Sequence, residues 1–293
     1  MPDRIRVATW NCFGVPAGVF GFLFGSPHLP ERFRIAQIAR ALASYDVVCV
    51  QESFLDAVAE FFDELADLLG LHLWHDRMLP HVRERSMFGG GLAILATQPL
   101  DVAFKIFPAK ASGFDAWACK GYATCELTTR SGAAFRLVNM HLQSEDPKDE
   151  PAVYLRARAA QIDSFLDGLA ALTDKKPTIV CGDLNVPEGS DEYHRVLLPR
   201  MAAHGFTDVG SGMGLLTYTP ARNALLRALD PHAIEARYDY VWTADGERHH
   251  FRVRTPPELL LAEPLSAVDE TAPPLFASDH FGIGVELELL ERA

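Results

Sequence analysis

The sequence predicts an α/β fold in which two packed sheets carry helices on their outer faces. Short runs rich in Val, Ile and aromatic residues alternate with longer runs whose apolar residues recur every three or four positions. No internal repeat, low-complexity tract or long linker interrupts this alternation. The chain has 293 residues, 48% of them hydrophobic, which is enough to bury a large core. We therefore expect one domain over residues 1–293.

The expected elements follow from these two periodicities. Runs rich in β-branched and aromatic residues predict strands at Ile5–Trp10, Val47–Gln51, Gly91–Ala96, Phe135–Met140, Pro177–Cys181, Tyr238–Trp242 and Phe281–Leu287. Helical spacing predicts helices at Arg32–Ser44, Ala57–Leu69, Pro151–Leu172 and Glu192–His204. Polar or Pro-containing tracts predict exposed loops at Pro80–Arg85, Ser144–Glu150 and Thr255–Pro274. Many strands with interspersed amphipathic helices are typical of packed sheets with helices outside.

Charge and cysteine content restrict the partners and the compartment. The formal net charge of −12 disfavours bulk nucleic acid and anionic membranes unless a basic patch or a divalent metal intervenes. The five cysteines form no C-x-x-C motif, which indicates buried reduced thiols. The N-terminus enters a strand pattern at once and lacks the apolar core of a secretory signal. We expect a cytoplasmic protein with no spanning helix and no obligate protein partner.

The segment Gly14–Gly25 is apolar, rich in glycine and too irregular for a helix or a strand. Its ordinary interpretation is a loop that packs on the body of the protein. The functional interpretation is a lid or an aromatic wedge for an apolar substrate, carried by Phe20, Phe22 and Phe24. Under the second interpretation this loop would make a peripheral membrane contact.

The segment Thr178–Asn185 ends a short apolar strand in Gly-Asp-Leu-Asn. Strand alternation points Asp183 and Asn185 to the same side. A carboxylate can take a proton from water, and a carboxamide can donate to a phosphoryl oxygen without adding repulsive charge. Gly, Asp and Asn also form turns, so this segment alone predicts a turn as readily as a site.

Polar residues end or closely follow strands at six places, and this repetition favours a site. Ligands gather where strand ends meet loops. Taken singly, each residue has an ordinary role: Asn11 fits a turn, Glu52 a helix cap and His141 a satisfied core histidine. The six groups are Asn11, Glu52, Asn139 with His141, Asp183 with Asn185, Asp239, and Ser278-Asp279-His280.

The order and wording of these motifs resemble the endonuclease/exonuclease/phosphatase superfamily over essentially the whole chain. The motifs are Trp-Asn-Cys-Phe-Gly, Val-Gln-Glu, Asn-Met-His-Leu-Gln, Gly-Asp-Leu-Asn, Tyr-Asp-Tyr-Val and Ser-Asp-His. The resemblance implies a magnesium-dependent phosphoesterase built as a four-layer α/β/β/α sandwich of two packed, mostly antiparallel sheets. It also implies that residues 1–293 form a single catalytic domain with the site at one rim of the sheets.

Within the superfamily, the chain is most similar to neutral sphingomyelinases. Asn11-Cys-Phe-Gly-Val-Pro16 resembles their opening, although Phe13 stands where Trp is usual. The pair Lys120-Gly121 and the sequence His141-Leu-Gln also resemble that subgroup. The resemblance implies substrate-binding roles for Asn11, Lys120 and Asn139. A solvated lysine beside a strand is an equally good interpretation of Lys120.

The negative charge of a phosphodiester repels an attacking water. A bound Mg²⁺ reduces this repulsion because it neutralises charge on the phosphate oxygens. Mg²⁺ prefers hard oxygen ligands and keeps several waters, so one or two carboxylates suffice. We expect Glu52 as the direct ligand, assisted by Asn11, with Asp279 on the other side. Mn²⁺ and Co²⁺ are the expected substitutes.

The expected catalytic roles complete the site. Asp183 would activate water, Asn185 would hold a phosphoryl oxygen, and His141 would donate to the phosphate or the leaving oxygen. His280 would stabilise the pentacovalent state, with Asp239 hydrogen-bonded to its other ring nitrogen. The resemblance leaves a second assignment open, in which His280 is the base and Asp183 its helper.

Three functions compete at this point. The first is a phospholipid phosphodiesterase of the sphingomyelinase type. The second is a nuclease or a soluble nucleotide or inositol-phosphate phosphatase with the same core site. The basic clusters of this chain, Arg83–Arg85 and Lys175–Lys176, are small for a surface that binds along a nucleic-acid backbone. The third, a binding module without activity, is disfavoured because every expected catalytic position is filled.

Overall fold

The computed structural model describes residues 3–15, 32–86, 88–109, 114–145, 150–265 and 276–292. It contains two six-stranded sheets. The first has the strand order β11 (His249–Leu260), β12 (Gly282–Glu291), β1 (Asp3–Gly14), β2 (Val47–Ser53), β4 (Ala93–Ala96) and β3 (His72–His75). The second has the order β5 (Val102–Ile106), β6 (Gly121–Thr128), β7 (Ala134–His141), β8 (Thr178–Asp183), β10 (Asp239–Ala244) and β9 (Phe206–Asp208). Among these pairings, β1 with β2 and β7 with β8 are parallel, and the others are antiparallel.

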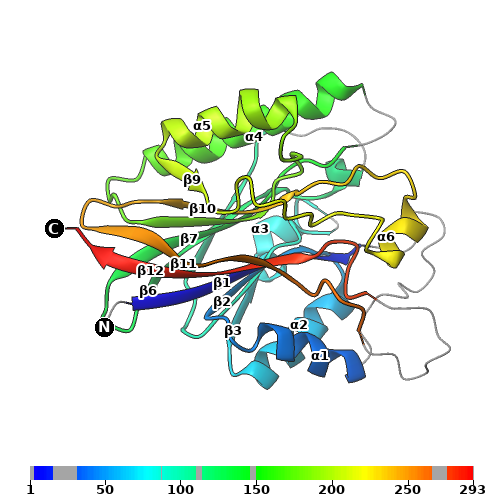
Figure 1. The fold of residues 1–293 in the computed structure, drawn as a ribbon, viewed down its shortest axis with the longest axis horizontal. Coiled ribbons are helices and arrows are strands. Elements are labelled where there is room, and N and C mark those ends of the chain that lie inside the picture. Colours follow the sequence, from blue (N-terminus) through cyan, green and yellow to red (C-terminus); the bar gives the residue numbers. More distant parts are fainter. Residues whose placement is uncertain are drawn as a thin grey trace.

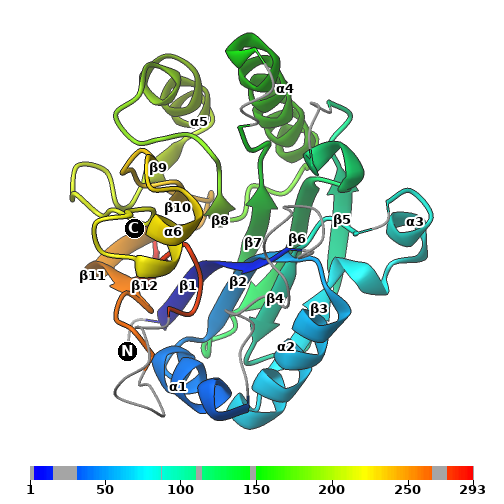
Figure 2. The same cartoon turned by 90° about the vertical axis from the view of Figure 1, so that its right-hand side faces the viewer.

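Helices cover the outer faces of both sheets, as the sequence predicts, and Figure 2 shows the four layers end-on. The long helices are α1 (Arg32–Leu42) and α2 (Asp56–Leu69) on the first sheet and α4 (Pro151–Ala170) on the second. The predicted helix Glu192–His204 is a π-helical turn, Tyr193–Leu197, followed by α5 (Leu198–Ala203). Shorter elements are α3 (Pro80–Arg83), α6 (Ala224–Leu229) and the 3₁₀ turns Asp76–Met78 and Phe114–Trp117.

Three apolar clusters hold the layers together. Val7, Cys49, Leu137 and Ile179 belong to the cluster between the sheets. Two further clusters fill the spaces between each sheet and its helices. All five cysteines are buried and free, as expected from the sequence. None of the helices in the described ranges is long and apolar enough to cross a bilayer.

Two predicted loops contain regular structure. The stretch Pro80–Arg85 begins with α3, because Pro80 occupies the first helical turn, where its missing N–H costs nothing. The stretch Thr255–Pro274 begins inside β11, which extends to Leu260. This strand lies at a sheet edge and shifts register on both sides of Thr255, so it accommodates Pro256 and Pro257.

Candidate active site

The predicted site residues meet at one rim of the sandwich. The carboxyl ends of the parallel pairs β1–β2 and β7–β8 point to this rim, and β10 and β12 begin there. In Figure 1 the rim lies to the right, opposite both chain termini. Across the second sheet, His141 pairs in register with Asp183, and Asp183 with Asp239. Topology therefore places three of the expected residues in one row.

Strand alternation turns this row towards the space between the sheets. Ile179 and Cys181 of β8 fill the inter-sheet core, and Asp183 continues the same face. On β7, His141 lies on the same strand face as the core residue Leu137, and on β10 Asp239 lies on the same face as Val241. The alternation that builds the core thus ends in polar side chains at the rim.

Two site residues have left-handed backbone conformations, which L-residues rarely adopt. Glu52 has φ 60° and Asn185 has φ 51°. Asn tolerates this region well, but a glutamate does so at a cost of about 1 kcal/mol or more. At Glu52 this geometry interrupts the alternation of β2, whose Val48 and Val50 face the helices.

Asp183 is held at both carboxylate oxygens. Asn11 Nδ2 donates to its Oδ2 at 2.9 Å, and the backbone N–H of Asn185 donates to its Oδ1 at 2.9 Å. His141 Nε2 lies 3.7 Å from Asp183 Oδ2 and 3.9 Å from Glu52 Oε1. Burial raises the pKa of Asp183 to about 6, against the opposing effect of His280.

Lys120 lies in the same cluster, although its predicted role was the least specific. Its Nζ is 2.9 Å from His141 Nε2, 2.9 Å from the carbonyl oxygen of Leu142 and 3.2 Å from Asp115 Oδ1. Asn185 Nδ2 lies 3.1 Å from the same imidazole nitrogen. Burial and the Lys120 charge hold the pKa of His141 well below its usual value. The imidazole is therefore neutral, and its Nε2 accepts from these donors.

His280 is charged, in contrast to His141. Its Nδ1 lies 2.9 Å from Asp239 Oδ2, and its Nε2 lies 3.9 Å from Asp183 Oδ2. Burial opposes the imidazolium, but Asp239, Asp183 and Asp279 outweigh it and raise the pKa of His280 to about 10. Thr217 Oγ1 accepts from the backbone N–H of Asp239, and the Tyr218 ring packs 4.7 Å from the imidazole.

Buried carboxylates make the rim suitable for a cation. Ligand atoms of Glu52, His141 and Asp183 lie within 4.8 Å of one another, as do those of Asp183, Asp239 and His280. Burial and the charge of Asp279 together raise the pKa of Glu52 to about 8. Carboxylates that destabilise each other in this way are stabilised by a cation. The hard oxygen donors fit Mg²⁺ better than a soft metal.

Asn139 lies beneath the rim rather than at its surface. Its Oδ1 accepts from Gln51 Nε2 at 2.7 Å, and its Nδ2 donates to the carbonyl oxygens of Val50 and Ala93 at 3.0 and 2.9 Å. Gln51 also donates to Thr9 Oγ1. This fully buried layer ties the two sheets together under the site. The expected substrate contact of Asn139 stays a prediction.

Sequence reasoning did not single out Asp115 or Gln51. Asp115 lies in the 3₁₀ turn Phe114–Trp117 and accepts from Gln143 Nε2, Ser144 N and Ser144 Oγ as well as Lys120. Its signal was a single acid in an apolar stretch. Gln51 stood directly beside Glu52 in the Val-Gln-Glu motif. Of the predicted loop Gly14–Gly25, only Gly14 and Val15 belong to the described residues, and Phe20, Phe22 and Phe24 lie outside them.

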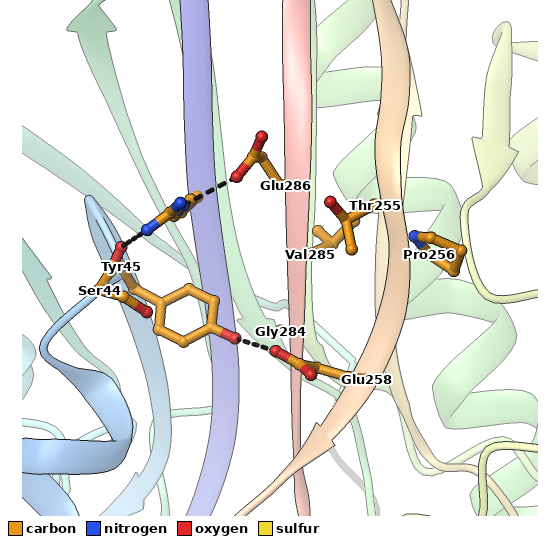
Figure 3. A pocket seen from close by; sticks show the side chains of 9 residues that line it. Ser44, Tyr45, Thr255, Pro256, Glu258, Gly284, Val285 and Glu286 are labelled. Carbon is orange, nitrogen blue, oxygen red and sulfur yellow. Dashed lines mark hydrogen bonds and ion pairs between the residues drawn. The ribbon is translucent and has the colours of Figure 1, made fainter.

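A hollow of about 300 Å³ lies elsewhere, along β1, β11 and β12. Figure 3 shows Tyr45 donating to Glu258 Oε1 across it, at 3.1 Å. Arg6 and Glu286, 2.9 Å apart, line it as well. It includes none of the predicted site residues, so the chemistry belongs to the rim.

Comparison with known proteins finds two sphingomyelinases C among the relatives of this chain. A sphingomyelinase C from Listeria ivanovii is 24% identical over 261 residues, which cover 84% of this chain and 74% of that protein. A sphingomyelinase C from Leptospira interrogans is 26% identical over 206 residues, 66% of this chain but only 36% of that protein. The chain thus spans about a third of the Leptospira protein's length.

Solved structures share the fold. A beta toxin variant from Staphylococcus aureus, solved with bound magnesium ions, superposes with a TM-score of 0.71 at 18% identity. The superposition covers 97% of this chain and 99% of the toxin. A family model matches residues 8–280, which include all the predicted site residues. The chain therefore belongs to the Endonuclease/Exonuclease/phosphatase family.

Proposed function

We propose that the chain is a Mg²⁺-dependent phosphodiesterase that hydrolyses a phospholipid of the sphingomyelin type and releases a phosphorylated head group. The observation that carries the reaction class is the row His141–Asp183–Asp239, with the His280 imidazole 3.9 Å from the Asp183 carboxylate. This row supports the proposal because it gathers hydrogen-bond acceptors and donors around one point of the rim. The lipid preference is supported by the two curated sphingomyelinase relatives.

Glu52 and Asp279, assisted by Asn11, are the groups proposed to hold the cation. When bound, the cation neutralises phosphoryl oxygens and stabilises the developing charge of the leaving alkoxide. Mn²⁺ or Co²⁺ would replace it in the same oxygen set.

The chain's own residues supply positioning and proton transfer. Asp183, fixed by Asn11 and Asn185, is proposed to take the proton of the attacking water. Lys120 and the Asn185 amide are proposed to donate to the phosphoryl oxygens, where negative charge grows in the transition state.

The two histidines have different expected tasks. In the substrate-free site, His141 Nε2 accepts from Lys120 and Asn185. When substrate binds, a phosphoryl or leaving oxygen would replace His141 Nε2 as the acceptor for these two donors. His280, held by Asp239, is proposed to stabilise the pentacovalent state as the imidazolium. The alternative, in which His280 takes the proton and Asp183 assists, requires the neutral imidazole.

The pH dependence of two variants separates these assignments. Asp183→Asn and His280→Gln should each lower the rate strongly, and the variant that removes the base should lose the acidic limb of the pH–rate profile. A variant that keeps near wild-type activity is not the base.

The substrate class needs a direct assay with three substrates. Purified protein with Mg²⁺ is incubated separately with sphingomyelin vesicles, plasmid DNA and bis-p-nitrophenyl phosphate, with Asp183→Asn as the inactive control. We expect phosphocholine release from the vesicles and loss of all activity in EDTA. DNA nicking without phosphocholine release would replace the lipid assignment with a nuclease. Activity on monoesters alone would indicate a phosphatase.

The cytoplasmic location and the membrane contact of Gly14–Gly25 stay predictions. Replacement of Phe20, Phe22 and Phe24 by Ser should lower activity on vesicles and spare soluble esters. Equal loss on both would reject a wedge in that loop.

A further inference from the structure

Asn223 is a fully buried amide whose oxygen and nitrogen hold two different parts of the chain. Its Oδ1 accepts from the backbone N–H groups of Leu225 and Leu226, at 3.0 and 3.2 Å, and so caps the first turn of α6. Its Nδ2 donates to the carbonyl oxygens of Ser278 and Asp279, at 2.8 and 3.1 Å. A carboxamide has two lone pairs and two N–H donors, so its whole hydrogen-bonding capacity is used here. One side chain therefore joins α6, which lies at the rim end of the sandwich in Figure 1, to the segment Ser278-Asp279.

The segment that Asn223 holds presents His280 to the rim. At one end of the peptide between Asp279 and His280, the carbonyl oxygen accepts from Asn223. At the other end, the His280 N–H donates to Ser278 Oγ at 3.1 Å, and this hydroxyl donates to the carbonyl oxygen of Asn11 at 2.7 Å. A planar peptide that is held at both ends limits rotation about the Cα atoms on either side of it. The directions of the Asp279 and His280 side chains therefore depend on the Asn223 amide.

Thr217 fixes the backbone beside the His280–Asp239 pair. It is fully buried in the segment between β9 and α6. Its Oγ1 accepts at 3.1 Å from the N–H of Tyr238, directly before Asp239. Its carbonyl oxygen accepts at 2.8 Å from the N–H of Phe281, directly after His280. The segment between β9 and α6 thus contacts the backbone beside both members of the pair, whose side chains lie 2.9 Å apart.

Helix capping alone does not account for the Asn223 amide. An N-cap needs an oxygen that accepts from the first turn, and Ser and Asp supply it as well as Asn. Among these residues only Asn also carries two N–H donors. Both of its donors leave the helix and end on the carbonyl oxygens of Ser278 and Asp279. The amide nitrogen therefore serves the rim and not the helix.

We propose that Asn223 is a positioning residue for the hydrolysis. Its amide nitrogen holds the backbone of Ser278-Asp279 so that Asp279 is directed to the cation and His280 to Asp183. It acts through these residues, because its four hydrogen bonds all lie within the chain. The inference rests on the proposed reaction at the rim and is independent of the lipid as its substrate.

Asn223→Ser tests this role, because serine retains the cap oxygen and removes the amide nitrogen. The matched control is Leu226→Ala, which weakens α6 through a fully buried side chain and leaves the amide in place. Two quantities are measured for each protein. The first is kcat on bis-p-nitrophenyl phosphate, and the second is the Kd of Mg²⁺, obtained from the rise in melting temperature during a Mg²⁺ titration.

We expect Asn223→Ser to lower kcat about tenfold or more with little change in KM, and to raise the Kd of Mg²⁺ about tenfold, as is typical for residues that orient a ligand. Leu226→Ala should lower the melting temperature at least as much and keep both quantities near their wild-type values. Wild-type kcat and Kd in Asn223→Ser, or equal losses in the two variants, would overturn the proposal. Hydrolysis of the soluble ester but not of sphingomyelin by the wild type would reject the lipid substrate alone, since neither measurement uses lipid.

Discussion

His280 Nδ1 and Asp239 Oδ2 lie 2.9 Å apart, which joins the segment before β12 to the first residue of β10 across the rim. Both residues are buried, and Asp239 Oδ1 has no hydrogen-bond partner among the described residues. A buried carboxylate with one free oxygen is costly, so the contact with His280 must supply much of its stabilisation. The contact also directs His280 Nε2 towards Asp183.

Asp239→Asn tests this relationship. The amide retains the shape but not the charge, so the imidazolium loses its stabilisation and the ring its fixed orientation. We expect kcat on a soluble phosphodiester to fall about 10²- to 10⁴-fold, with little change in KM. Steady-state kinetics measure the loss, and the melting temperature shows whether the variant is folded. A loss below tenfold would mean that Asp239 is structural.

Gly182→Ala should disrupt the row of site residues from its backbone. Gly182 has φ 148°, and a Cβ there would lie 1.8 Å from the carbonyl oxygen of Met140 on the neighbouring strand. The strands β7 and β8 would have to separate, which displaces Asp183 from His141. We expect a loss of about 3 kcal/mol or more in the free energy of unfolding, with loss of activity.

Gly189→Ala is the matched control for that variant. Its φ of 82° is also unfavourable for alanine, but a Cβ there meets no atom within 4 Å. The expected cost is about 1 kcal/mol with activity retained. Denaturant unfolding of the two variants should therefore separate backbone strain from the strand contact, and similar losses would contradict this account.

Much of the fold and the rim could be predicted because both depend on local signals. Central strands such as β2 and β8 are continuous apolar runs, and the polar residues that follow them stand out. Five strands escaped prediction and lack that signal: β3 and β9 are short, β11 contains two prolines, and β5 and β6 interrupt their apolar residues with Lys105, Thr124 and Glu126. Asp115 could not be predicted, because its partner Lys120 is set by the packing of a turn and not by a motif. The hydrogen bonds that Asn139 makes to Gln51 and Ala93 of the other sheet likewise depend on tertiary packing.

The helix α4 supports the loop that follows His141. Gln161 Oε1 accepts from the backbone N–H of Gln143 at 2.9 Å, and Arg158 Nη1 donates to the Gln143 carbonyl oxygen at 3.2 Å. Gln161→Leu would leave a buried N–H unsatisfied, at a cost of about 1–3 kcal/mol. We expect a lower melting temperature and faster hydrogen exchange of the Gln143 amide. Unchanged exchange would show that another group takes over the contact.

Stability should depend on pH through Asp76. Its Oδ1 accepts from the backbone N–H of Leu92 at 3.0 Å in a fully buried setting, and burial raises its pKa to about 6. Because this value exceeds the unfolded one, the folded state binds the proton more tightly, and stability falls as pH rises from about 4 to about 6. The change is on the order of 3 kcal/mol.

Asp76→Asn removes the titrating group and serves as the reference for this measurement. Urea unfolding at several pH values should show the wild type losing stability relative to the variant between about pH 4 and pH 6. A constant difference between the two proteins over that range would contradict the assignment. Above about pH 7 the difference in stability between the two proteins should stay constant, since Asp76 is then ionised in both the folded and the unfolded wild type.

Cation binding at the rim should be visible as stability, without any turnover. Burial and the Asp279 charge raise the pKa of Glu52 to about 8, so the cation-free site is destabilised by its own carboxylates. Mg²⁺ at about 100 times its Kd should stabilise the folded state by about 2.7 kcal/mol, and EDTA should reverse the rise in melting temperature. Glu52→Gln should lose most of this rise yet melt no lower than the cation-free wild type, because the amide never carries the charge that burial and Asp279 oppose at this position. Glu258→Gln is the control, since it makes the same chemical change in the hollow beside Tyr45 and should keep the full rise. An equal rise in both variants would place the cation away from Glu52.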